Sequence, residues 1–259
     1  MMSSDTKVAL ITGAARGIGR GIAAQLIADG YAVMLSDIRG DAAAETAAEL
    51  AAGGAAAAAA VAACQADVSD AEACRAMVSR TVERFGRLDA LVNNAGISKP
   101  QPSLEVPPED WRRMIDIQLN GVFFCSQAAG RQMVAQGSGG VIVNITSINA
   151  EAAFPQRASY VSAKAGVQML TKVLAIEWAE HNIRVNAVGP AHTETEMTLQ
   201  HIRSGRIQID ALQKRIPLGR LASVQDVANA VSFLVSDKAS FITGQSLYVD
   251  GGYLAFGYW

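Results

Sequence analysis

Short apolar, β-rich runs alternate along this chain with longer stretches whose apolar residues recur at helical spacing. The runs predict strands at Val8–Thr12, Ala32–Ser36, Ala58–Gln65, Leu88–Asn93, Gly140–Thr146, Ile183–Val188 and Ser246–Val249. The longer stretches predict helices at Ile18–Ala28, Asp41–Ala52, Asp70–Phe85, Pro107–Ala135, Ser159–His181 and Val224–Ser236. Ser69 is expected to cap the third helix. The alanine-rich strand at Ala58–Gln65 is expected only because the alternation requires one there, since alanine favours helix.

This alternation predicts the fold class. Strands that alternate with helices form a parallel sheet with helices on both faces, and right-handed connections make it a doubly wound α/β fold. No linker, charge run or repeat divides the 259 residues, so we expect one Rossmann-like domain over residues 1–259 with a seven-stranded sheet. The polar, irregular stretch Pro190–Pro217 interrupts the pattern, and a long loop of this kind predicts a lid over a site.

Composition and charge exclude several classes of protein. Hydrophobic residues make up 50% of the chain, which excludes disorder over most of its length. The 22 Lys and Arg residues nearly balance the 24 Asp and Glu residues, so charge gives no reason to expect binding to nucleic acid or an anionic membrane. We see no signal peptide, and the apolar run Ala55–Cys64 is far shorter than the roughly 20 residues of a membrane span. We therefore expect a cytoplasmic protein.

Cysteine and histidine patterns predict no metal site. The three cysteines, Cys64, Cys74 and Cys125, are widely spaced and form neither a disulfide framework nor a C-x-x-C pair. The three histidines do not cluster, and no serine-hydrolase elbow is present. A reducing compartment is the expectation that follows.

A glycine-rich turn follows the first predicted strand. Gly13, Gly17 and Gly19 permit a tight turn and a close approach of the backbone to a pyrophosphate, and the next helix offers free N–H groups. Position between a strand and a helix is the context that supports a dinucleotide site.

The end of the second predicted strand bears on the choice of cofactor. Asp37 can accept hydrogen bonds from ribose hydroxyls and would repel a 2′-phosphate, which favours NAD, although it could also be a simple helix cap. Arg16 and Arg39 favour NADP, because either guanidinium could bind a 2′-phosphate. We expect NAD, since Asp37 is the better placed of the three.

A set of polar residues carries the candidate chemistry. Tyr160 and Lys164 are four residues apart on one face of a predicted helix, and Ser147 ends a predicted strand at the edge where ligands of parallel sheets gather. With the glycine turn, Asn93-Asn94-Ala95-Gly96 and Asn186-Ala-Val-Gly-Pro190, this order of motifs resembles the short-chain dehydrogenase/reductase family over about residues 7–253.

The resemblance implies an oxidoreductase in which NAD carries a hydride and Tyr160 is the general acid and base. Lys164 and the nicotinamide charge would lower the pKa of Tyr160, Lys164 would also bind the nicotinamide ribose, and Ser147 would orient the substrate oxygen. The cofactor-binding residues implied are Gly13, Arg16, Gly17, Ile18, Gly19, Asp37, Asp67, Val68, Asn94, Gly96, Tyr160, Lys164, Pro190 and Thr195. Among them, Asp67 would contact the adenine and Thr195 the nicotinamide carboxamide.

Two positions depart from the family pattern. Gln118 occupies the place of the family's fourth catalytic residue, an Asn, four residues before Val122-Phe123. Asn120 is two places out of register and would point about 200° away on a helix. Because Gln carries the same amide on a longer arm, we expect Gln118 to be catalytic in a modified proton relay. Ala191 follows Pro190 where the family usually has Gly, and its β-carbon would narrow the nicotinamide side or shift the lid.

The loops expected around the substrate are polar. Asn149, Gln156, Arg157 and His192 are the predicted substrate-binding residues, and they favour a polyol or a sugar. A 3-oxoacyl or hydroxy-acid reductase on the same scaffold is an alternative, and a non-catalytic NAD-binding regulator is another.

The C-terminal segment Tyr253–Trp259 is unusually aromatic. Members of the family are commonly tetramers, and aromatic residues are enriched at protein interfaces. We therefore expect a homotetramer with this segment at a subunit interface, and packing on its own subunit is the alternative.

Overall fold

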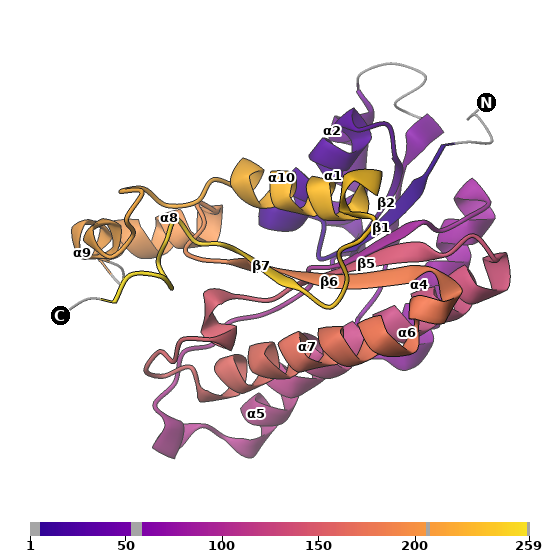
Figure 1. Ribbon diagram of the computed structural model, residues 1–259. Coiled ribbons are helices and arrows are strands. Elements are labelled where there is room, and N and C mark those ends of the chain that lie inside the picture. The colour runs from indigo at the N-terminus through magenta and orange to yellow at the C-terminus, as the bar shows by residue number, and fades with distance from the viewer. Residues whose placement is uncertain (1–5, 53–58, 206–207, 258–259) are drawn as a thin grey trace.

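The computed structural model describes residues 6–52, 59–205 and 208–257. Its seven strands form one parallel sheet in the order β3-β2-β1-β4-β5-β6-β7 (Figure 1). The strands are β1 Val8–Thr12, β2 Ala32–Asp37, β3 Val61–Gln65, β4 Ala90–Asn93, β5 Gly140–Ile145, β6 Ile183–Pro190 and β7 Ser246–Val249. The order reverses between β1 and β4, and ligands of such sheets bind beyond the carboxyl ends of strands at this point.

Helices cover both faces because successive residues of each strand point to opposite sides. From β1, Ala9 and Ile11 enter a core shared with α1 (Gly17–Ala28), α2 (Gly40–Ala51) and α10 (Val224–Val235). Leu10 enters the opposite core, which includes residues of α4 (Ala71–Phe85), α6 (Gly121–Gln136) and α7 (Ala158–Glu177) (Figure 1). The predicted doubly wound fold is confirmed. None of the helices in the described ranges is long and apolar enough to cross a membrane.

The cap of α4 and the start of the third strand differ from their predictions. Asp70, not Ser69, caps α4, because the Asp70 carboxylate accepts a hydrogen bond from the Glu72 amide at 2.8 Å while the Ser69 hydroxyl donates to Asp67 at 2.7 Å. The third strand begins at Val61 instead of Ala58, which lies outside the described residues. Ala59 and Ala60 before it are helical, as alanine favours.

The long helix predicted over residues 107–135 is interrupted. It consists of α5 (Pro108–Ile115), a π-helical segment (Asp116–Asn120) and α6. A π-helical turn accommodates an extra residue in a helix and is frequent at functional sites. Gln118 lies in the middle of this segment, so the change in helix type falls on the position where the sequence departs from the family pattern that it resembles.

The predicted lid is not an irregular loop. Residues 190–217 contain two short helices, α8 (Glu196–Arg203) and α9 (Ile209–Lys214). Thr195 caps α8, since its hydroxyl accepts a hydrogen bond from the Thr198 amide at 3.3 Å. Both helices lie at the carboxyl-end side of the sheet, next to the C-terminal segment (Figure 1).

Two of the three cysteines are in contact. Cys74 on α4 and Cys125 on α6 are buried, and their Sγ atoms are 3.3 Å apart. Their separation of 51 positions in the chain hides this proximity. The contact lies in the core between the two helices, and the Cys74 Sγ also lies 3.4 Å from the Val68 carbonyl oxygen.

Candidate active site

The glycine turn is fixed to the end of the neighbouring strand. Gly13 and Gly17 adopt φ values of +63° and +57°, which glycine tolerates without strain. The Asn94 side-chain amide donates to the carbonyl oxygens of Thr12 at 3.0 Å and Gly13 at 2.9 Å. The Thr12 hydroxyl accepts hydrogen bonds from the Asn94 and Ala95 amides, both at 3.1 Å. The Asn94 side chain therefore holds the turn in its shape.

The start of α1 is suited to an anion. Arg16 is the N-cap residue and its side chain forms no capping hydrogen bond, so it leaves the first amides of α1, including that of Ile18, available to an anion. Thr195 from the lid approaches the same place, with its methyl carbon 3.7 Å from where a Cβ on Gly17 would lie. A Cβ on Gly19 would lie 2.5 Å from the Asn94 amide nitrogen. The glycines therefore let the turn pack closely against the end of the neighbouring strand, as the turn of a dinucleotide site requires.

Asp37 is held beside this turn. Its carboxylate accepts hydrogen bonds from the Ala15 amide at 3.2 Å and the Arg39 amide at 3.0 Å, and the residue is buried. The guanidinium of Arg39 is half-exposed and lies 3.6 Å from the same carboxylate. Arg16 is exposed. All three residues considered for the cofactor choice therefore lie around one end of the glycine turn.

Three further residues of the predicted cofactor site lie along the carboxyl edge of the sheet, namely Asp67, Val68 and Pro190. Asp67 follows β3, and its carboxylate accepts hydrogen bonds from the Ser69 amide at 2.9 Å and hydroxyl at 2.7 Å. Val68 is buried against Gly121, where an added Cβ would lie 2.9 Å from the Val68 methyl. Pro190 ends β6 beside Val249. The amide of Ala191 donates to the Val249 carbonyl at 3.1 Å, which ties the beginning of the lid segment to β7.

Ser147, Tyr160 and Lys164 converge at this edge. Ser147 follows β5 and caps a short 3₁₀ turn, accepting a hydrogen bond from the Asn149 amide at 3.1 Å. Its hydroxyl lies close enough to the Tyr160 phenol to lower the pKa of that phenol. Lys164, one turn beyond Tyr160 on α7, places its Nζ 5.7 Å from the Tyr160 ring centroid and donates to the Ile145 carbonyl at 2.7 Å. The three side chains predicted to be catalytic therefore form one cluster.

Burial controls the ionisation of this cluster. Desolvation raises the pKa of Tyr160, and the Ser147 hydrogen bond and the positive charge of Arg157 partly oppose it. Desolvation lowers the pKa of Lys164 from 10.5 to about 8. The sequence predicts a Tyr160 pKa lowered by Lys164 and by the nicotinamide; from the protein groups alone, burial outweighs the charges and raises it.

Gln118 contacts the loop at residues 96–97, which follows β4. The residue is buried, and its Nε2 donates to the Ile97 carbonyl at 2.5 Å. Its Oε1 has no hydrogen-bond partner among the described residues and lies against Gly96, where an added Cβ would be 2.8 Å away. Asn120 instead donates to Asp116 at 2.9 Å on its own helix. Gln118 is thus the amide that faces the 96–97 loop.

The four predicted substrate residues are not equivalent. The Asn149 amide donates within its own loop to the Ala152 carbonyl at 3.3 Å, and Gln156 is exposed with a φ of +61°. Arg157 and His192 lie nearer the chemistry. The Arg157 guanidinium carbon is 5.9 Å from the Tyr160 ring centroid, and burial followed by the Arg157 charge lowers the pKa of His192.

Sequence analysis did not foresee an aromatic wall beside these residues. The rings of Phe154 and Tyr253 stack with centroids 6.0 Å apart, and His192 meets both edge-on at 6.1 and 6.4 Å. Arg215 covers the other part of the C-terminal segment, with its guanidinium 4.4 Å from the Tyr253 ring and 5.3 Å from the Phe256 ring. The described part of this segment therefore packs on its own chain, whereas Tyr258 and Trp259 lie outside the described residues.

A buried polar network lies behind the carboxyl edge of the sheet, and the sequence patterns do not predict it. Asn93 donates to the side chains of Asn144 at 2.8 Å and Ser126 at 2.9 Å, and Asn144 donates to Thr171 at 2.9 Å. Asn93 and Asn144 are register partners on β4 and β5. The network joins both strands to α6 and α7, and α7 carries Tyr160 and Lys164.

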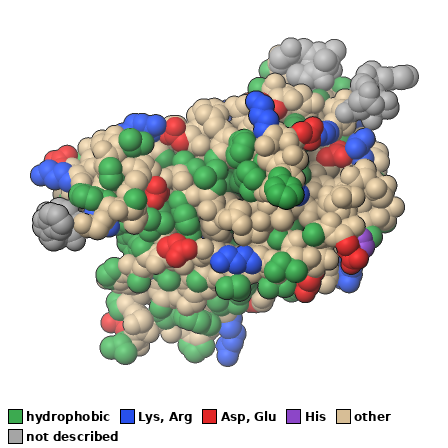
Figure 2. All heavy atoms as spheres, viewed as in Figure 1, with side chains coloured by type: hydrophobic (Ala, Val, Ile, Leu, Met, Phe, Trp, Pro, Cys, Tyr) green, Lys and Arg blue, Asp and Glu red, His purple; other side chains and the backbone are tan. Residues whose placement is uncertain are grey.

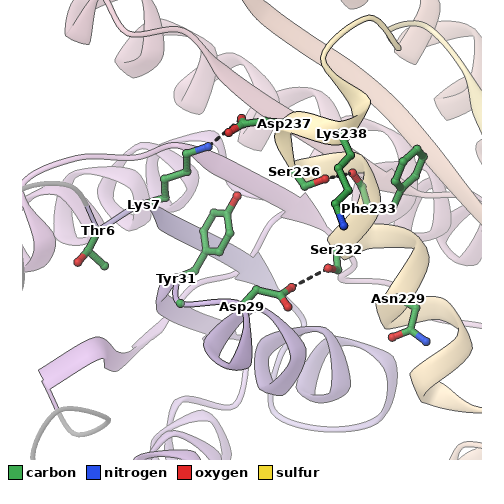
Figure 3. Close-up of a pocket in the computed structure, with 11 residues that line it drawn as sticks. Thr6, Lys7, Asp29, Tyr31, Asn229, Ser232, Phe233, Ser236, Asp237 and Lys238 are labelled. Atoms are coloured by element: carbon green, nitrogen blue, oxygen red, sulfur yellow. Dashed lines mark hydrogen bonds and ion pairs between the residues drawn. The ribbon is translucent and has the colours of Figure 1, made fainter.

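A cavity of about 600 Å³ lies at the opposite, amino edge of the sheet (Figure 3). Its polar groups satisfy one another: Lys7 pairs with Asp237 at 2.9 Å, Ser232 donates to Asp29 at 2.6 Å, and Tyr31 donates to the Val235 carbonyl at 3.3 Å. Among the described residues, no three His, Cys, Asp or Glu side chains are grouped to hold a metal. The candidate chemistry therefore lies at the carboxyl edge.

Comparison with known proteins agrees with this geometry. The family model described as enoyl-(acyl carrier protein) reductase matches residues 13–254. The chain is 42% identical over 247 residues to a 3-oxoacyl-(acyl-carrier-protein) reductase of Staphylococcus aureus, covering 95% of this chain and 98% of that protein. It is also 42% identical over 250 residues to a cis-4-hydroxycyclohexanecarboxylate dehydrogenase of Sinomonas cyclohexanicum, covering 96% and 97%.

A solved structure extends the likeness to the whole fold. A gluconate 5-dehydrogenase from Burkholderia cenocepacia, in complex with NADP and tartrate, superposes with a TM-score of 0.89 at 37% identity, covering 97% of this chain and 96% of that one. The chain belongs to the short-chain dehydrogenase/reductase family. It is an oxidoreductase of the alcohol and ketone type, with the nicotinamide cofactor site that this fold provides.

Proposed function

We propose that this protein is an NAD-dependent dehydrogenase/reductase that interconverts a secondary alcohol and a ketone on a small polyhydroxylated substrate. The observation that carries the proposal is the cluster of Ser147, Tyr160 and Lys164 beside the glycine turn. It combines a proton-transfer group, a hydrogen-bond donor for the substrate oxygen and a cation at the edge where a dinucleotide binds.

The proposed mechanism assigns one task to each side chain. In alcohol oxidation, the Tyr160 phenolate takes the hydroxyl proton while the C–O single bond becomes a carbonyl. Ser147 donates a hydrogen bond to the same oxygen and fixes its orientation. Lys164 stabilises the phenolate when protonated, and Gln118 positions the 96–97 loop beside the proton relay. The bound nicotinamide supplies the chemistry of accepting the hydride from the carbinol carbon.

The cofactor would be held by the residues around the glycine turn. The backbone of Gly13, Arg16, Gly17, Ile18 and Gly19 binds the pyrophosphate, and Asp37 accepts hydrogen bonds from the adenosine ribose. Asp67 and Val68 contact the adenine, Asn94 and Gly96 line the adenosine side, and Pro190 and Thr195 face the nicotinamide. Asp37 supports NAD because its buried carboxylate is fixed by two backbone amides next to the turn.

NADP is the competing cofactor. The gluconate 5-dehydrogenase relative was solved with NADP, and Arg39 lies where a guanidinium could meet a 2′-phosphate. The Asp37 carboxylate opposes this, since it would face a doubly charged phosphate at close range. The cofactor preference is therefore the first property to measure.

A second candidate function is the reduction of a 3-oxoacyl thioester. The 42% identity to a 3-oxoacyl-(acyl-carrier-protein) reductase supports it. Arg157 and His192, which lie near Tyr160, support a polar substrate instead. A solved relative with the same fold is named for gluconate, a sugar acid. A polyol or sugar derivative remains the preferred substrate class.

The proposed assembly is a homotetramer. Hydrophobic side chains are exposed on the face that carries α7, α10 and the edge strand β7 (Figure 2). They include Met169, Val173, Ile176, Phe233 and Leu247. Apolar side chains exposed on neighbouring elements of one face favour contact with a second copy of the chain. Sedimentation analysis of the purified protein tests the assembly size.

The function is tested by cofactor reduction with NAD and with NADP across polyols, sugars, hydroxy acids and simple secondary alcohols, with Tyr160→Phe as the control. We expect turnover with NAD, abolished or reduced ~100-fold or more in Tyr160→Phe while NAD binding is retained. NAD binding without turnover on any alcohol or ketone would favour the non-catalytic regulator. Turnover confined to 3-oxoacyl thioesters would favour the second candidate.

A further inference from the structure

Arg157 brings an uncompensated positive charge to the catalytic tyrosine. Its guanidinium carbon lies 5.9 Å from the Tyr160 ring centroid, and its Nη1 donates to the Ser98 hydroxyl at 2.7 Å. No carboxylate in the described ranges lies within ion-pair distance of it. A guanidinium has five N–H donors, and a single hydroxyl leaves most of them available.

The groups around Arg157 do not neutralise it. The first turn of α7, which begins directly after Arg157, holds no acidic residue. Glu151 accepts hydrogen bonds from Gln168 at 2.5 Å and Tyr248 at 3.2 Å instead. Burial and the Arg157 charge both lower the pKa of His192, so its imidazole is neutral at pH 7. The charge that Arg157 brings close to Tyr160 is therefore not balanced by an ion pair within the described ranges.

Aromatic rings surround His192, whose pKa responds to the Arg157 charge. Phe154, His192 and Tyr253 present their rings on one side, and Arg215 is occupied by the Tyr253 and Phe256 rings and by the Tyr253 carbonyl at 3.1 Å. The carbon skeleton of a substrate can pack on these rings. A neutral polyol would leave the guanidinium without a charged partner, whereas a carboxylate would form a charge-assisted, bidentate pair with it.

We propose that Arg157 binds a carboxylate of the substrate, so that the enzyme acts on a small hydroxy acid and its oxo acid. Ser98 holds the guanidinium in place, the carbinol carbon lies at Tyr160 and Ser147, and the aromatic wall covers the skeleton between the two ends. This inference rests on the proposed function and takes a hydroxy acid, whether or not it is also a sugar derivative, as the substrate of that reaction. Arg157 is then the residue that determines specificity.

The reaction balances without a further reactant. The carbinol carbon loses a hydride to the nicotinamide, its oxygen loses a proton to Tyr160, and the carbon–oxygen double bond forms. The carboxylate at Arg157 is unchanged throughout. Its pairing with Arg157 is made equally before and during hydride transfer, so it should act mainly on KM and less on kcat.

The test compares substrates that differ only in the acid group. The pairs are cis-4-hydroxycyclohexanecarboxylate and its methyl ester, 3-hydroxybutyrate and its methyl ester, and gluconate and glucitol. kcat and KM are measured for wild type, Arg157→Gln, Arg157→Lys and Ser98→Ala. Arg80→Gln, an exposed arginine on α4, controls for the loss of one charge.

We expect wild type to prefer the acid of at least one pair by tenfold or more in kcat/KM. Arg157→Gln should lower that preference at least tenfold through KM. Because the Arg157 charge also lowers the pKa of Tyr160, any fall in kcat should be shared by the acid and its neutral partner, while the rise in KM should be confined to the acid. Arg157→Lys should keep part of the preference, Ser98→Ala should weaken it, and Arg80→Gln should not change it. Equal use of acids and neutral partners by wild type, or equal loss of both in Arg157→Gln, would overturn the inference.

A binding measurement separates this inference from the proposed function. Calorimetry with the same acids, in the presence of NAD, is run on wild type and Arg157→Gln. Acid binding that depends on Arg157, without turnover on any compound, would keep the carboxylate site and overturn the proposed activity. Turnover on neutral alcohols without Arg157-dependent binding of any acid would keep the activity and overturn the carboxylate site. Absence of both would overturn both.

Discussion

Two groups of Arg39 approach the same oxygen atom of Asp37. The Arg39 amide donates to Asp37 Oδ1 at 3.0 Å, and the Arg39 Nε lies 3.6 Å from that atom. The two side chains favour different cofactors, since a carboxylate suits ribose hydroxyls and a guanidinium suits a 2′-phosphate. Asp37 is buried and held by backbone amides, while Arg39 is half-exposed. The acid is therefore the fixed element of the pair.

Cofactor preference should follow the Asp37 charge. Asp37→Asn keeps a hydrogen-bond acceptor for one of the backbone amides but removes the repulsion of a 2′-phosphate. We expect the ratio of kcat/KM for NADP to that for NAD to rise at least tenfold, which corresponds to about 1.4 kcal/mol. Arg39→Ala should move the ratio the other way. An unchanged ratio in Asp37→Asn would show that this carboxylate does not select the cofactor.

The pH dependence of alcohol oxidation should report the Tyr160 phenol. Burial raises the pKa of Tyr160, and the Ser147 hydrogen bond lowers it in part. Because the phenolate is the base, kcat/KM for oxidation should increase with pH above neutrality. Ser147→Ala should shift this rise in kcat/KM to higher pH, besides slowing the reaction. A rise that stays at the same pH or shifts to lower pH would contradict the assignment of Tyr160 as the base.

Lys164 should make the protein less stable below pH 8. Its pKa falls from 10.5 in the unfolded chain to about 8 in the fold, so the unfolded state binds more protons between these values and stability rises with pH across that window. The shift corresponds to roughly 3 kcal/mol at about 1.4 kcal/mol per pKa unit. Replacing Lys164 with an apolar residue would also remove its hydrogen bond to the Ile145 carbonyl. This loss offsets part of the stability gained by removing the buried charge.

Urea unfolding of wild type and Lys164→Met at several pH values between 7 and 10.5 measures this effect. The free energy of unfolding of wild type should increase relative to that of Lys164→Met as pH rises above about 8. The variant should be inactive at every pH. A difference between the two proteins that does not change with pH would mean that Lys164 is not destabilised by burial.

Gln118 should matter for turnover more than its neighbour Asn120. Gln118→Ala removes the hydrogen bond to the Ile97 carbonyl and leaves a space against Gly96, so we expect kcat to fall at least tenfold. Asn120→Ala, which loses only a contact with Asp116, should keep kcat within about twofold. Circular dichroism and urea unfolding check that both variants fold. Unchanged turnover in Gln118→Ala would remove Gln118 from the mechanism.

The glycine turn should not tolerate a methyl group at Gly19. A Cβ there would lie 2.5 Å from the Asn94 amide nitrogen and would also meet the Gly13 carbonyl oxygen, which the backbone fixes. Gly19→Ala should lose about 1–3 kcal/mol of stability and most NAD affinity. Gly257→Ala, with nothing within 4 Å, is the control for the added methyl. NAD titration followed by fluorescence measures both, and wild-type affinity in Gly19→Ala would contradict the proposed pyrophosphate site.

Local patterns were enough to predict most of the fold. Apolar β-branched runs define buried strands closely, and Val8–Thr12 and Ser246–Val249 have the predicted bounds. The helices of the lid segment were missed because α8 and α9 are short and polar. The π-helical segment was missed because a 3.6-residue period continues through it in the sequence.

The site was predictable only where motifs mark it. Ser147, Tyr160 and Lys164 stand in recognisable spacing, and the fold brings them together. The hydrogen bond between Asn93 and Asn144 depends on the register of two strands that lie 51 positions apart in the chain. The stacking of Phe154 on Tyr253 likewise joins distant segments, and no local pattern encodes it.

The two ends of the chain differ as places for a fusion partner. Thr6 lines the cavity at the amino edge, whereas Tyr253 belongs to the aromatic wall, and the first and last described residues lie on opposite sides of the molecule (Figure 1). An affinity tag or reporter domain joined at the amino terminus would be attached far from the reacting groups. The same addition at the carboxyl terminus would be attached a few residues from the substrate pocket, where its bulk would compete with substrate entry.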